Sequence, residues 1–218
     1  MNVRRALVGP LEGEYWYVRL ALGGIALLLG VLIVPLLYVG GQFAAVLRNG
    51  EHQALREDPR GLLGDGIRVL FIVIAYLLIP AVIGVWTIGA SLVEFLSGTE
   101  QAFLLGLTWI VLGGGLTAVL TVLFGYLAVG GLVLFVRSGS ILDAFAFRRL
   151  SVLLRSRPFA VGYATSLVLF FVIGVISAIP IVGWGIAPFA TYFALLAAAG
   201  IWAEAARDAE SDYDDSIF

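Results

Sequence analysis

Four long stretches without a charged side chain constrain this sequence more than any other feature. They are 28, 25, 35 and 46 residues long and cover Leu20 to Leu47, Val69 to Val93, Ala102 to Val136 and Pro158 to Ala203. About 20 apolar residues cross a bilayer as a helix, so each stretch is long enough to do so. With 61% hydrophobic and 13% charged residues, the composition excludes an ordinary soluble domain.

We therefore expect an all-α fold, a polytopic bundle of five transmembrane helices. The first span begins at the aromatic residues Tyr15 to Tyr17, which suit the headgroup region, and extends to Arg48 with a kink at Pro35. A polar connection follows it, the second span covers about residues 67–96, and SGTEQ forms a short loop.

The two longest stretches need separate treatment. A straight helix of 35 residues reaches about 52 Å, well past a hydrocarbon core of roughly 30 Å. We expect one long span broken at Gly113 to Gly115, because a hairpin there would leave backbone groups unpaired in lipid. The 46-residue stretch must fold back, and its turn is expected at Pro180 to Pro188, which holds two prolines and the interfacial Trp184.

The distribution of arginine predicts the orientation. Five arginines lie in Arg137 to Arg157 and four in Arg48 to Arg68, whereas the loops at 97–101 and 181–185 hold none. The positive-inside rule then places both long connections in the cytoplasm, the N-terminus outside and the C-terminus inside the cell membrane. Arg4, Arg5 and Arg19 oppose that orientation of the first span, so six spans with a cytoplasmic N-terminus is the alternative.

Two short phrases recur and suggest a duplication. IPAVIGVW at Ile79 resembles IPIVGW at Ile179, and VGGQFAAVLRNG at Val39 resembles VGGLVLFVRSG at Val129. Two parallel repeats of about 16–97 and 102–206 would explain this, although short matches also arise readily in a chain rich in Gly, Val and Ile. We treat 1–208 as one membrane domain and expect the acidic tail, 209–218, to be disordered.

Candidate chemistry is sparse. The chain has no cysteine and one histidine, His52, so no thiolate or zinc site is expected. No serine has a base beside it, and we place Arg19 and Glu94 at span ends, where their side chains reach the headgroups. We expect no catalytic residue, no cofactor, no metal and no nucleic acid partner, and hence a protein that is not an enzyme.

The connection SILDAFAFRRLSVLLRSRPF is the most informative polar stretch. We expect a helix from Ser140 to Arg157, with Arg148, Ser151 and Arg155 on one face. Leucines and alanines occupy the other face, at Leu142, Ala146, Leu150, Leu153 and Leu154. Such a helix lies at the membrane surface, with Arg148, Arg149, Arg155 and Arg157 contacting anionic lipid headgroups. Simple anchoring of the topology, or binding of a cytoplasmic protein, would use the same residues.

The residues above favour a non-enzymatic membrane scaffold that binds lipid or a partner protein. The alternative is a transporter or channel for a neutral or hydrophobic solute. In that case the kink or helix-packing positions Gly113, Gly114, Gly115, Pro80 and Pro180 would line the path. The sequence does not give an oligomeric state.

Three segments resemble a family of archaeal membrane proteins known as domain of unknown function 4013. They are LLGDGIRVLFIVIAYLLIP, AFAFRRLSVLLRSRPFAVGYATSLVLFFVIG and IPIVGWGIAPFATYFALLAAAGIWAEA, and the likeness covers about residues 15–208. The first connection, REDPRGLLGD, departs from the more aromatic acidic stretch usual in that family. The resemblance implies a membrane architecture and an archaeal origin, and it implies no activity.

Overall fold

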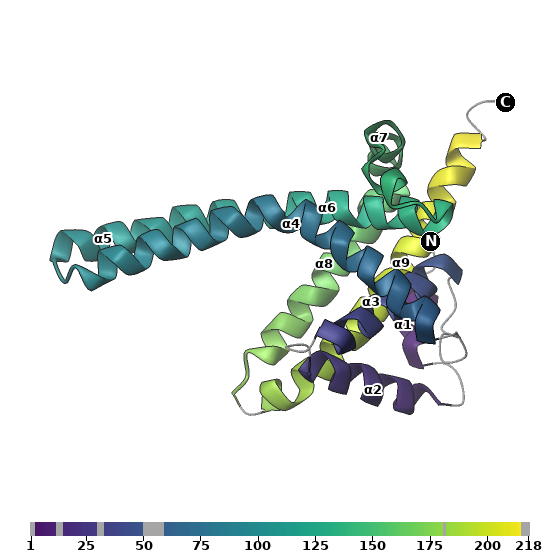
Figure 1. Ribbon diagram of the computed structural model, residues 1–218, viewed down its shortest axis with the longest axis horizontal. Coiled ribbons are helices and arrows are strands. Elements are labelled where there is room, and N and C mark those ends of the chain that lie inside the picture. Colours follow the sequence, from purple (N-terminus) through teal and green to yellow (C-terminus); the bar gives the residue numbers. More distant parts are fainter. Residues whose placement is uncertain (1–2, 12–14, 30–32, 50–58, 181, 215–218) are drawn as a thin grey trace. The chain divides into compact units, whose positions relative to one another are not determined.

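The computed structural model describes residues 3–11, 15–29, 33–49, 59–180 and 182–214. Within these ranges the regular elements are all helical and no strand occurs, which confirms the all-α class (Figure 1). In chain order the elements are α1 (Val3–Val8), η1 (Gly9–Leu11), α2 (Trp16–Leu28), α3 (Ile33–Asn49), α4 (Pro59–Leu96), α5 (Glu100–Thr108), η3 (Trp109–Gly113), α6 (Gly114–Ser138), η4 (Ile141–Phe145), α7 (Phe147–Arg155), α8 (Arg157–Ser177) and α9 (Val182–Asp214).

Four helical runs in the described ranges are long and apolar enough to cross a membrane. They are Arg60–Leu96, Glu100–Ser138, Arg157–Ser177 and Gly185–Ala209. The first expected span differs from the prediction, because α2 ends at a turn at Leu29 and α3 begins at Ile33. Pro35 therefore lies in the first turn of α3, where proline is tolerated, and not at a kink. With 13 and 17 residues, α2 and α3 are about 20 and 26 Å long, each shorter than the hydrocarbon core.

The 35-residue charge-free stretch belongs to one continuous helical run, as expected. α5, η3 and α6 follow one another without a gap, and η3 is a single π-helical segment that ends at Gly113. The run starts after a short loop in which Thr99 Oγ1 accepts a hydrogen bond from Ala102 N at 3.2 Å. Gly98 in that loop has φ +71°, a conformation that favours glycine.

The 46-residue stretch folds back, but its turn is shorter than predicted. α8 ends at Ser177 and α9 begins at Val182, so Pro180 lies in the turn. Pro188 is instead an internal residue of α9. α9 then continues to Asp214, so the acidic tail that we expected to be disordered is helical over residues 209–214, and residues 215–218 lie outside the described ranges.

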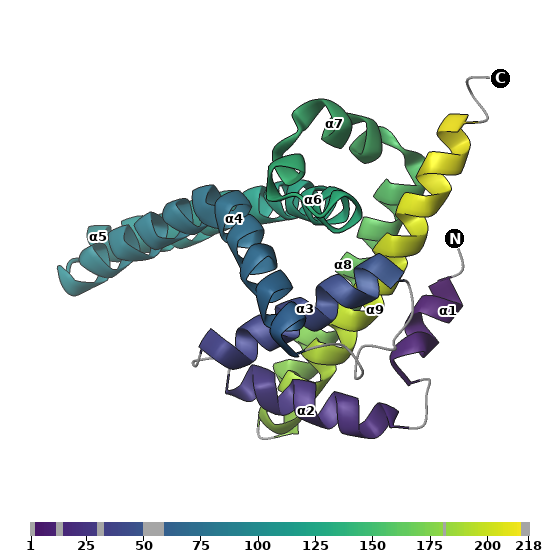
Figure 2. The same ribbon diagram turned by 45° about the vertical axis from the view of Figure 1, so that its right-hand side comes forward.

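The chain divides into two compact units, and the larger comprises Met1–Phe71 and Gly130–Phe218. Its core is α9, which contacts α1, α2, α3 and α8 (Figure 2). Ala194, Ala197 and Ala198 are fully buried on α9, and such small side chains let helix backbones approach closely. Trp202 also makes a polar contact with α8, since its Nε1 donates to Ser166 Oγ at 3.1 Å.

The smaller unit, Ile72–Val129, is an antiparallel pair formed by the later part of α4 and the run from α5 into α6 (Figure 1). Small residues stand where the two helices meet: a Cβ at Gly84 would lie 3.1 Å from Thr117, and one at Gly106 would lie 2.6 Å from the Phe95 ring. Its outer faces are apolar and exposed, which suits a lipid environment. The duplication of 16–97 and 102–206 is independent of this division and stays a prediction.

Candidate lipid-headgroup interface

The connection between α6 and α8 contains two short helices and not the single helix that we predicted from Ser140 to Arg157. A 3-10 segment, η4, comes first, and Ala146 then interrupts the helical conformation, because its backbone has φ −75° and ψ 80°. α7 follows and ends at Arg155, and the extended backbone of Ser156 then precedes Pro158 in the first turn of α8. Proline suits the start of a helix, which explains why α8 begins here.

α7 turns its leucines toward the protein. Leu150 is 1% exposed and Leu153 is 8% exposed. Beneath them lies Gly130 of α6, where a Cβ would be 2.6 Å from Leu150 Cδ1 and 3.0 Å from Leu154 Cδ2. α7 also contacts α8. The apolar face of α7 is therefore covered by other helices of the larger unit. This packing fixes which face of α7 points outward.

The arginines occupy the remaining surface. Arg148, Arg149, Arg155 and Arg157 are all exposed, the first three on α7 and the last at the start of α8. Arg149 Nη1 forms an ion pair with Asp143 Oδ2 of η4 at 3.4 Å. No ion pair joins the other three to any described residue, so the surface keeps a net positive charge. We call these four residues the α7 arginine surface.

One predicted apolar position behaves differently. We placed Leu142 on the apolar face of a continuous helix, but it belongs to η4, outside α7, and is 81% exposed. The break at Ala146 changes the helical phase between η4 and α7, so a single helical wheel does not describe both. Phe147 and Val152, 70% and 51% exposed, also face outward from α7.

The predicted kink and helix-packing positions lie in different surroundings. Gly113 packs against Thr87, where a Cβ would lie 2.5 Å from Cγ2, whereas Gly114 and Gly115 have open space beside them. Pro80 is buried inside the uninterrupted α4, and Pro180 lies in the exposed turn before α9. Pro80 and the three glycines belong to the smaller unit, and Pro180 belongs to the larger one.

Sequence reasoning missed a polar group buried within the larger unit. Arg19 is 5% exposed, and its Nη2 donates to the Pro10 carbonyl oxygen at 2.6 Å, so it does not reach the headgroups as we expected. It interacts electrostatically with Tyr192 of α9, which also interacts with Tyr38 of α3. Tyr38 in turn accepts a hydrogen bond from Gln42 Nε2 at 3.1 Å.

The signal for this group was present in the sequence. Gly23 follows Arg19 by four residues and therefore shares its helix face, and Gly24 adjoins it in the chain. Gly23 packs on the Tyr192 ring and Gly24 on the Phe189 ring. Small residues beside a charge indicate that the face packs against another helix and does not point toward water.

Metal-binding groups are absent from the part of the chain that the structure describes. There, no three His, Cys, Asp or Glu side chains come together as metal ligands would. His52 lies outside the described ranges.

These observations define an all-helical protein with apolar helices of membrane-spanning length. A family model described as a protein of unknown function (DUF4013) matches residues 24–186, and the chain belongs to this family. No curated protein and no solved structure matches the chain.

Proposed function

We propose that this protein is a non-enzymatic membrane scaffold of the cell membrane, whose α7 arginine surface binds anionic lipid headgroups. The observation that carries the proposal is the division of α7, with leucines buried in the protein and arginines exposed. Because the leucines fix the rotation of the helix, the arginines are held on the outer surface without further ordering. An archaeal origin, and a cytoplasmic protein as a second partner of the same surface, belong to the same proposal.

The chemistry of arginine supports phosphate as the bound group. The guanidinium is planar, always charged and rich in N–H donors, so it can contact two phosphate oxygens at once. Each basic residue near an anionic leaflet contributes about 1 kcal/mol of attraction. Phe147 and Val152, which flank the arginines, can enter the boundary between headgroups and acyl chains.

Contacts along α9 support a cytoplasmic N-terminus for the same membrane protein. Ala6 of α1 packs at Gly200, in the later half of α9. The chain then reaches Phe189, near the start of α9, where Gly24 packs on the ring. The chain then returns along α3 toward the later half of α9. There the ring centroids of Phe43 on α3 and Trp202 on α9 lie 5.8 Å apart.

We infer that α2 and α3 together enter and leave the membrane from one side. This agrees with the alternative of a cytoplasmic N-terminus, in which α1, the end of α3 and the end of α9 share the arginine-rich side. It also removes the conflict of Arg4 with the positive-inside rule.

A transporter is the second candidate, and the buried Arg19 favours it. Ionisable side chains inside a membrane bundle often belong to substrate or ion pathways. In this chain the buried Arg19 of α2 donates to the Pro10 carbonyl oxygen and interacts electrostatically with Tyr192 of α9. A transporter would move solute independently of the exposed arginines on α7.

The test compares two double variants in lipid nanodiscs that contain phosphatidylcholine with or without phosphatidylglycerol. Arg148→Gln with Arg155→Gln removes two charges of the α7 arginine surface. Arg4→Gln with Arg60→Gln removes two exposed charges elsewhere and serves as the control. Native mass spectrometry after release measures how much phosphatidylglycerol each protein retains.

We expect the α7 variant to lose retained phosphatidylglycerol and the control variant to keep it. Equal retention in both variants would contradict the scaffold proposal. Solute flux through reconstituted vesicles that survives the α7 substitutions would favour the transporter instead.

A further inference from the structure

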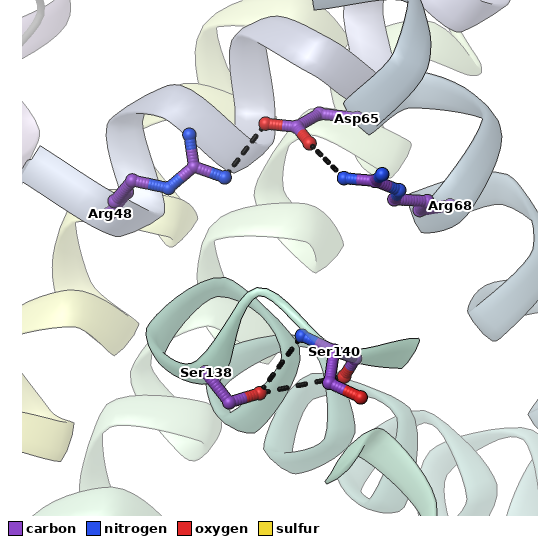
Figure 3. A network of polar contacts seen from close by, with 5 residues as sticks. All are labelled: Arg48, Asp65, Arg68, Ser138 and Ser140. Atoms are coloured by element: carbon purple, nitrogen blue, oxygen red, sulfur yellow. Dashed lines mark hydrogen bonds and ion pairs between the residues drawn. The ribbon is translucent and has the colours of Figure 1, made fainter. Parts of the chain in front are cut away.

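Two arginines and one aspartate form an ion-paired group where α3 and α4 meet. Arg48, the second-last residue of α3, donates from Nη2 to Asp65 Oδ2 at 2.7 Å. Arg68 of α4 donates from Nη1 to Asp65 Oδ1 at 3.3 Å. Figure 3 shows both guanidinium groups directed at the single carboxylate. We call Arg48, Asp65 and Arg68 the α3–α4 clamp.

Glycines hold the two helices at a fixed spacing beside the clamp. A Cβ at Gly41 of α3 would overlap the carbonyl oxygen of Leu62, and a Cβ at Gly66 of α4 would overlap that of Leu37. Each helix therefore contributes a bare backbone position to the crossing. Because helices in such close contact cannot slide without a clash, the two arginines keep their separation.

The α3–α4 clamp has an excess of positive charge and of hydrogen-bond donors over acceptors. Two guanidinium groups and one carboxylate leave a net charge of +1, and the side chains of Arg48 and Arg68 are 41% and 49% exposed against 16% for Asp65. Each guanidinium has five N–H donors, more than one carboxylate can accept from two arginines. Exposed ion pairs of this kind contribute little to stability, so stability alone does not account for the arrangement.

Both arginines border long charge-free stretches of the sequence. Arg48 follows directly after the charge-free stretch that ends at Leu47, and Arg68 directly precedes the one that begins at Val69. In a membrane protein such boundaries lie at the headgroups, where arginine side chains meet lipid phosphate.

The spacing between the two arginines of the α3–α4 clamp recurs in the second connection. Arg48 and Arg68 are 20 residues apart, since 68 minus 48 is 20, and Arg137 and Arg157 are also 20 apart, since 157 minus 137 is 20. Figure 3 includes the end of α6, where Ser140 N donates to Ser138 Oγ at 3.1 Å just after Arg137. Each connection thus has an arginine at both of its ends.

We infer that the α3–α4 clamp is a second anion site, separate from the α7 arginine surface, that binds the phosphate group of an anionic lipid or free inorganic phosphate. Asp65 orients the two guanidinium groups, and a phosphate that bridges their remaining donors neutralises the net charge of +1. Bidentate contacts of this type are the ones that distinguish arginine from lysine in phosphate recognition. The inference rests on the membrane placement in the proposed function, but it uses different residues.

The experiment uses the full chain in the same nanodiscs. Arg48→Gln with Arg68→Gln removes both arginines of the α3–α4 clamp. Arg48→Lys with Arg68→Lys keeps the charge but loses the planar guanidinium that makes two parallel hydrogen bonds. Arg4→Gln with Arg60→Gln is the matched control. We expect binding of phosphatidylglycerol to weaken about tenfold or more in the glutamine variant, the loss expected for one charge-assisted hydrogen bond. The lysine variant should fall between it and the unchanged protein.

Inorganic phosphate distinguishes the two sources of the ligand. It is titrated at constant ionic strength against chloride. If phosphate displaces phosphatidylglycerol from the unchanged protein, the phosphate group alone suffices for binding. If phosphatidylglycerol stays bound, the headgroup in its bilayer is the ligand.

Asp65→Asn separates binding from a purely structural role. The substitution raises the net charge to +2 and keeps one side-chain oxygen that can accept from the arginines, so an anion site should retain at least as much phosphatidylglycerol as before. If this variant and the glutamine variant both lose thermal stability while lipid retention is unchanged, the α3–α4 clamp is only a structural tie and the inference is wrong.

The two proposals fail separately. Unchanged retention in the α3–α4 clamp variant, together with loss in the α7 variant, overturns the clamp and leaves the proposed function. The opposite result supports the clamp and contradicts the role of α7.

Discussion

At the scale of single residues, glycines on one helix have opposite roles according to what faces them. Gly64 and Gly66 are two residues apart on α4, and the sequence treats them alike. A Cβ at Gly66 would overlap the Leu37 carbonyl oxygen, whereas nothing lies within 4 Å of a Cβ at Gly64. Only the partner helix distinguishes the two positions.

Alanine substitution tests this difference. Gly66→Ala should lower the free energy of unfolding by about 1–3 kcal/mol, because the backbone of α3 must shift to admit the methyl group. Gly64→Ala is the matched control and should be neutral or stabilise by up to about 1 kcal/mol, since alanine favours helix more than glycine does. Thermal unfolding in detergent, followed by circular dichroism, measures both. Equal effects would contradict the close approach of α3 and α4.

At the scale of elements, α7 shows how tertiary packing selects a face. Its alternation of arginine and leucine predicts an amphipathic helix, but a helix of nine residues is too short to be stable alone in water. Its stability must come from the contacts of Leu150 and Leu153 with the larger unit. α7 therefore depends on α6 and α8 more than on lipid.

Truncation of the leucines tests that dependence. Leu150→Ala should destabilise the protein by about 2–5 kcal/mol, as expected for a buried leucine. Leu142→Ala, at a position that is 81% exposed, should change stability by less than about 0.5 kcal/mol. Chemical unfolding monitored by tryptophan fluorescence gives both values. A large effect at Leu142 with none at Leu150 would mean that α7 packs through its other face.

At the scale of the whole molecule, the proposed sidedness of the N-terminus depends on α2 and α3. One span from Tyr15 to Arg48 would put the N-terminus outside, whereas two short helices that both pack on α9 would return it to the arginine-rich side. Segments that enter and leave on one face need protein around their backbone at membrane depth. α9 provides it through contacts at Phe189, Tyr192 and Trp202.

Cysteine accessibility tests this arrangement in a chain that has no native cysteine. Single cysteines at exposed Arg4, Ser97 and Leu142 report on the N-terminus, the α4–α5 loop and the α6–α7 connection. We expect positions 4 and 142 to share one side and position 97 to label from the other. Labelling of 4 together with 97 would restore the five-span arrangement with an external N-terminus.

The sequence by itself determined the helical class, the family, the long helical runs and the arginine-rich connection. These properties depend on local composition and on the absence of charge over 20 or more consecutive residues. Both can be read from the sequence without knowing which segments lie together in the fold. Thr99 as a helix cap and Pro158 in the first turn of α8 are local in the same sense. Their signals lie within a few residues of the structure that they specify.

Only the tertiary structure decided which helix face is covered and which charge is buried. Gly23, one turn after Arg19, indicates that this helix face packs against another helix, but the sequence does not identify Tyr192 of α9 as the residue that it meets. Arg48 and Asp65 are 17 residues apart, with a segment outside the described ranges between them, and the glycine crossing of α3 and α4 brings them together. Such contacts join residues that are distant in the chain, and their energy depends on shape and burial, which no local pattern contains.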